Sequence, residues 1–441
     1  MPGMIAKCIE VRVYLDPRPG LFIGVRQQLL QQAQGRFEIA RPGVPASGIV
    51  LDERSRKTLP GAVVFAKRDQ AVGTETASKW IAKGLTEYSV SNMLGVVTTG
   101  ISQSQPAGTP ADSWRLPAEW EPHERCLMAW PTRREIWGEY FDEVKADYAR
   151  LARTIARFEP LQMIANPRDA FEASSLCGPA VSILELTIDD SWARDSGPIF
   201  LVDGRGGRTA SAWRFTAWGG KYTPHDQDAL LARRVAEHLK LPVMSSDVAL
   251  EGGAILSDGQ GTIITTETCL LNRNRNPGLS KAEIDAELKR VFCASKIIWL
   301  PGDPTETETD GHIDGLMALA APARALFEAV DDSTDPRFEI MRENRRALEL
   351  QADARGRRFE IVPIAEASRK TEIGERYCRS YVNFYIANGA VVAPSYGQPT
   401  DGDVETALRD AFPDRTIVML PIGKIAMGGG GFHCITQQLP G

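Results

Sequence analysis

Helical and β-forming segments alternate along most of this 441-residue chain, and this alternation constrains the fold more than any other feature of the sequence. Ser280 and Glu283 form the S-x-x-E pattern of a capping box, which predicts the start of one helix. Apolar residues recur at helical spacing in five segments, which span 142–157, 228–240, the segment that starts at Ser280, 336–354 and 403–412.

Short runs of β-forming residues lie between these helices, at 161–165, 181–186, 198–203, 261–266, 296–300, 316–321, 359–364 and 416–422. Within 381–394, the pair Asn388-Gly389 suits the type I′ turn of a hairpin between two apolar strands. A unit of a few strands and one helix therefore recurs about every 55–80 residues. This recurrence predicts an α/β fold, built either as a closed ring of such units or as a doubly wound sheet.

The first 105 residues have a different pattern. Residues 102–113 are rich in Ser, Pro and Gly, as linkers are. We therefore expect a small N-terminal extension of uncertain fold over 1–105, without a catalytic constellation, and a catalytic unit over 110–441. Within the extension, the patterns predict strands or short helices at 9–15, 27–34, 48–52, 61–67 and 77–85.

The chain carries 51 Lys and Arg against 57 Asp and Glu, which gives a net charge of −6. Because nucleic-acid binding needs basic side chains that neutralise phosphates, this balance disfavours a nucleic-acid partner and suits a cationic ligand. No apolar run approaches the ~20 residues of a membrane span, and the N-terminus lacks the apolar core of a signal peptide. We expect a cytoplasmic protein with reduced cysteines and no membrane partner, either alone or as a homo-oligomer.

A glycine-rich segment near the C-terminus, MGGGGFHCITQQ (427–438), gives the strongest chemical signal. Its four glycines destabilise regular structure and let the backbone approach a ligand closely. Cys434 follows them, and a cysteine presented in this way is a candidate nucleophile if cationic or dipolar neighbours stabilise its thiolate. The other six cysteines have no comparable context, so we expect inert buried thiols there.

His312 and Asp314 lie two residues apart in ETDGHIDG (308–315), so on a strand both side chains face the same side. A histidine beside a carboxylate can act as general acid and base. No C-x-x-C or H-x-x-x-H spacing indicates a metal site, and no G-x-G-x-x-G follows a strand and opens a helix. We therefore expect neither a metal nor an organic cofactor.

Two further motifs supply carboxylates. The segment IDDSWARDSGP (188–198) contains Asp190, Trp192 and Asp195, and its acids in a turn-rich stretch before a strand are plausible as the edge of a site. The segment LEGGAI (250–255) places Glu251 before two glycines. Three carboxylates beside a thiol and an imidazole suit a planar cation, because a guanidinium presents its N–H donors in a fork that matches carboxylates. The residues indicate a cysteine-dependent enzyme that acts on guanidino compounds.

The sequence resembles the agmatine deiminase family of the guanidino-group-modifying (pentein) superfamily from about residue 110 to 440. The motifs that carry this resemblance occur in the family's order: LPAEWEPHERCLMAWPTRREIWG (116–138), DDSWARDSGPIF (189–200), WGGKY (218–222), LEGGAI, CLLNRNRNPGLS (269–280), ETDGHID, YVNFYIANG (381–389) and GGGGFHCITQQ. The resemblance implies a five-bladed α/β propeller of ββαβ-type units around a central site. It does not extend to the N-terminal extension.

The resemblance also implies a role for each candidate residue. Cys434 would form a covalent amidino-cysteine intermediate, while His312 would protonate the departing ammonia and then activate water. Asp195 and Asp314 would grip the guanidinium, and Glu251 would complete the site. The implied reaction converts agmatine and water to N-carbamoylputrescine and ammonia.

Three alternatives stay open from the sequence. The first is a deiminase of another guanidine, such as peptidyl-arginine or free arginine, and the second is a catalytically silent binding protein of the same fold. The third is a generic thiol hydrolase such as a cysteine protease, which would cleave peptide bonds. Asp190 and Trp192 favour a substrate whose far end is an amine, because an amine needs acidic or π-rich neighbours. The five residues expected to do chemistry argue against the silent protein.

Overall fold

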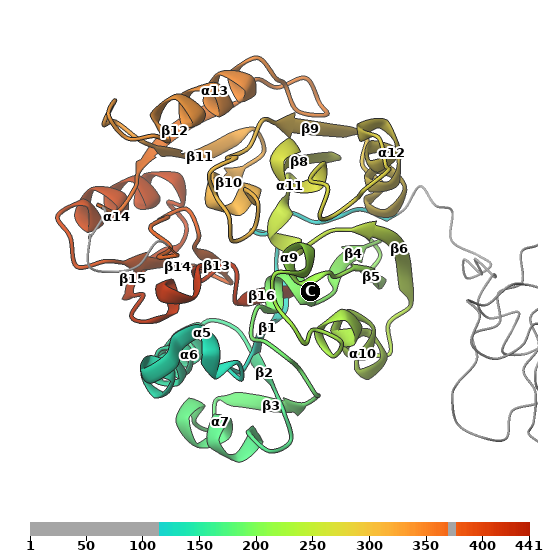
Figure 1. Ribbon diagram of the computed structural model, residues 1–441, viewed down its shortest axis with the longest axis vertical. Helices are drawn as coiled ribbons and strands as arrows, with labels where there is room; N and C mark the ends of the chain where they lie inside the picture. The colour runs from blue at the N-terminus through green and yellow to red at the C-terminus, as the bar shows by residue number, and fades with distance from the viewer. Residues whose placement is uncertain (1–113, 369–375) are drawn as a thin grey trace, which may run out of the picture. The chain divides into compact units, whose positions relative to one another are not determined.

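The computed structural model describes residues 114–368 and 376–441, whose strands form five separate sheets (Figure 1). The strands and helices predicted within residues 1–105 lie outside the described residues, as does the whole linker predicted at 102–113. Within the described part of the chain, no helix is long and apolar enough to cross a membrane.

Four of the sheets repeat one ββαβ pattern: two antiparallel strands are followed by a helix and by a third strand, parallel to the second. The first such unit contains β4 (Ile199–Val202), β5 (Arg208–Arg214), α10 (Leu231–His238) and β6 (Val243–Ala249). The next three contain β7 (Ile255–Ser257), β8 (Thr262–Thr266), α12 (Lys281–Phe292) and β9 (Lys296–Leu300); β10 (Met317–Ala321), β11 (Arg324–Ala329), α13 (Phe338–Glu349) and β12 (Glu360–Ala365); and β13 (Tyr385–Ala387), β14 (Ala390–Ser395), α14 (Thr400–Ala411) and β15 (Thr416–Pro421).

The fifth sheet joins the beginning and the end of the described chain. Its strands and helices are β1 (His123–Ala129), α6 (Phe141–Ile155), β2 (Leu161–Ala165), α7 (Ala170–Cys177), β3 (Val181–Glu185) and β16 (Thr436–Pro440). Because β16 pairs antiparallel with β1, the last strand completes the first unit, and the five units surround a common centre in Figure 1. The predicted α/β class and the closed arrangement of ββαβ units are confirmed, and the alternative of one doubly wound sheet is wrong.

All five predicted helices are present, as α6, α10, α12, α13 and α14. The capping box is confirmed, because the Ser280 hydroxyl accepts a hydrogen bond from Glu283 N and the Glu283 carboxylate accepts one from Ser280 N. The predicted hairpin between β13 and β14 is also confirmed. The predicted type I′ turn is wrong, because Gly389 has φ 76° but Asn388 does not have the positive φ that this turn type requires at both central residues. The sequence patterns did not predict α7, β1, β5, β6, β7, β11 and β16.

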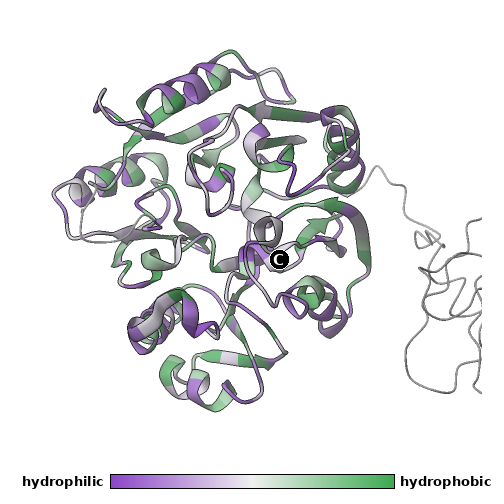
Figure 2. Ribbon diagram, viewed as in Figure 1, coloured by the Kyte–Doolittle hydropathy of each residue, from purple (hydrophilic) through white to green (hydrophobic). Residues whose placement is uncertain are grey.

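The apolar core lies between the helices and the sheets. All five residues of β2 and all five of β8 are buried, whereas α6 buries one face, including the predicted Val144, Tyr148, Leu151 and Ile155. Figure 2 shows the same division, with apolar residues along most strands and mixed polar and apolar residues along the outer helices. Burial of this apolar surface is the main stabilising contribution to each unit.

Candidate active site

The five units contribute site residues from one equivalent place, the segment directly before each unit's first strand. Hydrogen bonds and close contacts connect these segments across the centre of the ring. In chain order the segments carry Asp195 in α8 (Ala193–Ser196), Glu251 before η4 (Gly252–Ala254), His312 and Asp314 at η5 (Ile313–Gly315), Asn383 before β13, and Cys434 before β16.

Cys434 is buried and lies between Asn383 and Asp314. Its Sγ is 3.3 Å from Asn383 Nδ2, 3.4 Å from Asn383 Oδ1 and 3.6 Å from Asp314 Oδ2. The glycine segment packs against the cysteine so closely that a Cβ on Gly430 would lie 3.1 Å from the Cys434 Cβ and would collide with the ring of Trp192. This close approach of the backbone explains the glycine at position 430.

The charges around Cys434 favour a neutral thiol in the absence of a ligand. Burial raises the pKa of Cys434 well above its ordinary value, and the carboxylates of Asp314 and Asp195 raise it further. A cation held between these two carboxylates would offset their charge and favour the thiolate. The site is therefore suited to a nucleophile that a cationic substrate activates.

His312 directs its two ring nitrogens toward different partners. Nε2 is 3.4 Å from Glu251 Oε2, while Nδ1 is 3.9 Å from Asp195 Oδ1 and 3.9 Å from Asp314 Oδ1. Among the described residues, the buried Nδ1 has no hydrogen-bond partner. Burial alone lowers the pKa of His312, but the charge of Asp195 and the contacts with Cys269 and Glu251 outweigh it and raise the pKa well above its ordinary value. An imidazolium here can donate a proton between the two aspartates.

The backbone of Gly253 forms the floor between these side chains. Its N–H donates a 2.9 Å hydrogen bond to Asp195 Oδ1, and Trp218 Nε1 donates a 2.9 Å hydrogen bond to Asp195 Oδ2. A Cβ at Gly253 would lie 2.7 Å from His312 Nδ1, 2.9 Å from Asp195 Oδ1 and 2.9 Å from Asp314 Oδ2. Three polar atoms thus converge on the position that a side chain at residue 253 would occupy, so this close approach requires glycine.

Glu251 holds His312 from the other side and is itself held by an arginine. Arg275 is completely buried, and its Nε is 2.8 Å from Glu251 Oε1. Burial alone raises the pKa of Glu251, but His312 and Arg275 lower it below its ordinary value. Glu251 is therefore a carboxylate, which orients the imidazole and favours its protonated form.

Glu251, Cys269 and His312 form the one group in the described part of the chain whose donor atoms could hold a metal ion, all lying within 4.8 Å of one another. The guanidinium of Arg275 already balances the charge of Glu251. Because this cation would repel a metal ion at the same carboxylate, the group is better explained as the support of His312.

Trp192 and Asp190 lie in the segment that leads to α8. Trp192 stacks on Trp137 with ring centroids 6.1 Å apart and meets Trp218 edge-on at 6.4 Å, so three tryptophans form an aromatic wall beside the glycine segment. Asp190 Oδ2 lies 2.9 Å from Arg133 Nε, and Asp190 Oδ1 accepts a hydrogen bond from Ser191 N. Burial raises the pKa of Asp190 to about 7 despite Arg133. The described contacts of Asp190 are with these neighbours, and its role toward an amine stays a prediction.

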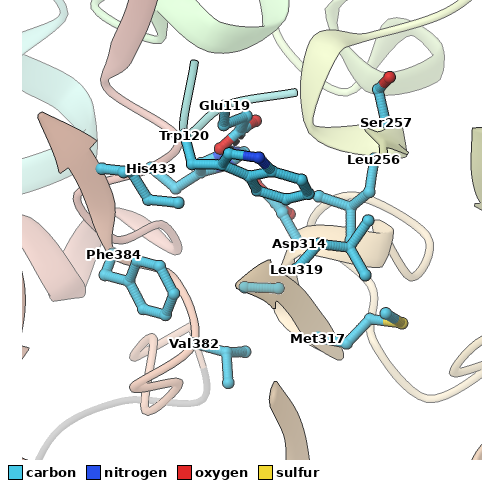
Figure 3. A pocket seen from close by; sticks show the side chains of 12 residues that line it. Glu119, Trp120, Leu256, Ser257, Asp314, Met317, Leu319, Val382, Phe384 and His433 are labelled. Carbon is cyan, nitrogen blue, oxygen red and sulfur yellow. Dashed lines mark hydrogen bonds and ion pairs between the residues drawn. The ribbon is translucent and has the colours of Figure 1, made fainter. Parts of the chain in front are cut away.

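A second set of charged side chains lies next to Asp314. His433 Nδ1 is 2.8 Å from Asp314 Oδ2, and His433 Nε2 is 2.9 Å from Glu119 Oε1. Glu119 Oε1 in turn lies 3.1 Å from an Nη of Arg194. Glu119, His433 and Asp314 share a small pocket with apolar residues such as Trp120 (Figure 3).

The structure brings together five of the predicted residues, Asp195, Glu251, His312, Asp314 and Cys434. The sequence analysis missed Asn383, whose Oδ1 accepts a hydrogen bond from His433 N at 3.0 Å and whose Nδ2 donates one to Asp314 O at 3.2 Å. The available signal was a single amide residue just before an apolar strand in YVNFYIANG. The sequence analysis also assigned no role to four ionisable side chains that contact the site or its neighbours: Glu119, Arg194, Arg275 and His433.

Comparison with known proteins places the chain among guanidine deiminases. The profile of the family described as Porphyromonas-type peptidyl-arginine deiminase matches residues 115–440. Agmatine deiminase of Pseudomonas aeruginosa (strain LESB58) is 39% identical over 362 residues, covering 76% of this chain and 98% of the relative. That of Stutzerimonas stutzeri (strain A1501) is 38% identical over 353 residues, covering 75% and 96%.

Two solved structures are similar to this chain. Agmatine deiminase of Enterococcus faecalis has a TM-score of 0.73 at 30% identity, covering 76% of this chain and 98% of that chain. A cysteine-to-serine variant of C. jejuni agmatine deiminase with substrate bound has a TM-score of 0.68 at 26% identity, covering 74% and 96%.

Proposed function

The chain belongs to the Porphyromonas-type peptidyl-arginine deiminase family, and we propose from this premise that it is an agmatine deiminase. Relatives named agmatine deiminase match three quarters of this chain and nearly all of their own length. The reaction converts agmatine and water to N-carbamoylputrescine and ammonium, and its product serves putrescine biosynthesis.

One observation carries the proposal: the Nδ1 of His312, which has no hydrogen-bond partner among the described residues, lies 3.9 Å from an oxygen of Asp195 and 3.9 Å from an oxygen of Asp314. This spacing suits a guanidinium held by both carboxylates, with one terminal nitrogen beside the imidazole. A bound cation offsets the negative charges of Asp314 and Asp195, which raise the pKa of Cys434. Substrate binding itself therefore promotes the thiolate.

In the first half of the proposed reaction, the sulfur of Cys434 forms a bond to the guanidinium carbon. The bond from that carbon to a terminal nitrogen breaks as His312 protonates this nitrogen, and the proton lost by the thiol leaves with the ammonia. The product of this step is a positively charged amidino-cysteine, which Asp195 and Asp314 continue to stabilise.

In the second half, His312 is neutral and takes a proton from water, whose oxygen bonds to the amidino carbon. The carbon–sulfur bond then breaks and the sulfur regains a proton as a thiol. His312 keeps the proton that it took from water, so it is an imidazolium again for the next turnover. Glu251 supports both charge states of His312 by holding Nε2.

Ammonia release from purified protein tests the proposal with agmatine, free arginine and a peptidyl-arginine substrate as separate reactions. We expect release from agmatine and its loss in Cys434→Ala. Cys177→Ala is the matched control, because Cys177 is a buried free cysteine on α7, outside the site. Release from either arginine substrate alone would contradict the assignment, and unchanged release in Cys434→Ala would remove the covalent mechanism.

Three further properties belong to the same proposal. Free thiols such as those of Cys126, Cys177, Cys269, Cys378 and Cys434 support a cytoplasmic location, where cysteines stay reduced. Residues 1–105 form an extension that the catalytic unit does not need. Assembly as a homo-oligomer is a prediction that light scattering of the purified chain would test.

A further inference from the structure

His433 lies between two carboxylates, one on each ring nitrogen. Nδ1 is 2.8 Å from Asp314 Oδ2, and Nε2 is 2.9 Å and 3.1 Å from the two oxygens of Glu119. A carboxylate can only accept hydrogen bonds, and a neutral imidazole has a single N–H to donate. Both contacts are satisfied only when His433 is an imidazolium.

The charge of His433 affects the site because its partner Asp314 lies among other ionisable side chains. Asp314 is buried and faces His433, His312, Cys434 and Asn383, with Asp195 on the far side of His312. A buried carboxylate close to other carboxylates ordinarily takes up a proton. Burial does raise the pKa of Asp314, but the hydrogen bond and charge of His433, followed by the charge of His312, lower it below its ordinary value.

Glu119 and Arg194 complete an alternating row of charges. Burial alone raises the pKa of Glu119, but His433 and Arg194 lower it to about 2, so Glu119 is a carboxylate at any working pH. Burial and Arg194 lower the pKa of His433, and Glu119 and Asp314 outweigh them and raise it.

This row also connects two chain segments of the site. Arg194 and His433 directly precede Asp195 and Cys434 in the sequence, and the backbone N–H of Arg194 donates a 3.2 Å hydrogen bond to Cys434 O. Glu119 forms ion pairs with the side chains of Arg194 and His433. One carboxylate therefore links the segment that carries Asp195 to the segment that carries Cys434.

We propose that His433 is a positioning residue that remains an imidazolium during turnover, held so by Glu119, and that it keeps Asp314 ionised for the guanidinium. This inference rests on the proposed deiminase function for its kinetic consequence. Its structural part, the charge state of His433, is independent of the substrate.

The charge state is measured on the full chain with ¹⁵N-labelled histidine by NMR. The chain has five histidines, and the His433 signal is assigned as the one that disappears in His433→Gln. We expect both ring nitrogens of His433 to be protonated at pH 7, and Glu119→Gln to lower the midpoint of its titration by roughly one pH unit or more. A neutral His433 at pH 7 in the unaltered protein would overturn the proposal.

The kinetic consequence is a change in the pH profile of His433→Gln. Without the imidazolium, Asp314 takes up a proton at higher pH, so the acid limb of kcat/KM for agmatine moves up by about one unit. The loss of kcat/KM is then roughly tenfold larger on the acid limb, below both midpoints, than on the plateau of the profile. Glu328→Gln is the control, because Glu328 is a buried carboxylate in the separate ion-pair cluster of Arg337.

A merely structural role for His433 predicts a different result. It would lower kcat/KM by one factor at every pH and leave the acid limb in place, and that outcome would overturn the proposal. Absence of agmatine turnover by the unaltered protein would contradict the proposed function instead, while the NMR titration would still decide the charge of His433.

Discussion

Substitution of Gly253 by alanine tests whether the space between His312, Asp195 and Asp314 is the substrate site. The added methyl group would lie 2.7 Å from His312 Nδ1 and 2.9 Å from an oxygen of each aspartate. Ordinary van der Waals contact begins near 3.4 Å, so these three polar atoms would each have to retreat by roughly half an ångström. Catalytic groups tolerate misplacement of only ~0.5 Å, and an error of about 1 Å costs on the order of 100-fold in rate.

We therefore expect Gly253→Ala to lower kcat/KM for agmatine by ~100-fold or more, measured by ammonia release. Overpacking at one buried site costs about 1–3 kcal/mol, so thermal unfolding should still show a cooperative transition at a moderately lower Tm. Gly315→Ala is the matched control: it lies beside Asp314, yet no described atom comes within 4 Å of the added Cβ. Near-normal turnover in folded Gly253→Ala would refute this location of the guanidinium.

Three other perturbations have defined outcomes. Arg275→Met leaves Glu251 buried without its cation and should cost about 3–5 kcal/mol of unfolding free energy in urea, whereas Arg290→Met, at an exposed ion pair with Glu287, should cost under about 1 kcal/mol; equal costs would contradict the structural role of Arg275. Burial raises the pKa of Asp228 to about 8, so the folded chain keeps a proton that the unfolded chain loses near pH ~4, and this group makes stability fall as pH rises from there through 8. Asp228→Asn should then raise Tm at pH 9 and change it little at pH 4, and the same shift at both pH values would refute this explanation. Deletion of residues 1–105 should leave agmatine turnover intact, and an inactive or insoluble product would show that the catalytic unit needs the extension.

The fold could be predicted from the sequence where periodicity is strong. The segment 142–157 has its apolar residues on one helical face, and α6 buries that face. In contrast, α7 buries only Ala173 and Cys177 and exposes 84% of Phe171, so its sequence carries no continuous apolar stripe. The strand β16 is equally hard to predict from the sequence, because TQQLP contains polar residues and a proline. Its pairing with the distant β1 defines it as a strand.

The site was predictable where a residue type itself signals chemistry. A cysteine after four glycines and a histidine two residues before an aspartate are unusual arrangements, and both lie at the centre of the ring. Asn383 gives no such signal, since an isolated amide is common beside strands and its contact with Cys434 joins residues 51 positions apart. Arg275 and Glu119 are charged residues that a sequence assigns to the surface by default, and only the three-dimensional contacts reveal that they serve other charges.

The repeat explains why chemistry gathers at one place in this fold. Each ββαβ unit packs its helix against its own strands, and the polar segment before its first strand faces the centre. Because five units contribute one such segment each, the site receives a thiol, an imidazole, an amide and carboxylates without any unit holding more than a few of them.

The three carboxylates of the site would repel one another in a buried space. Two of them are paired with a cation: Glu251 with Arg275, and Asp314 with His433. Within the described ranges, Asp195 receives two N–H donors and no arginine or lysine, and its pKa is raised by burial and by the neighbouring carboxylates. Among the cations of the described chain, Asp195 faces only the imidazolium of His312 at 3.9 Å, so it is the carboxylate of the three that a bound guanidinium would stabilise most.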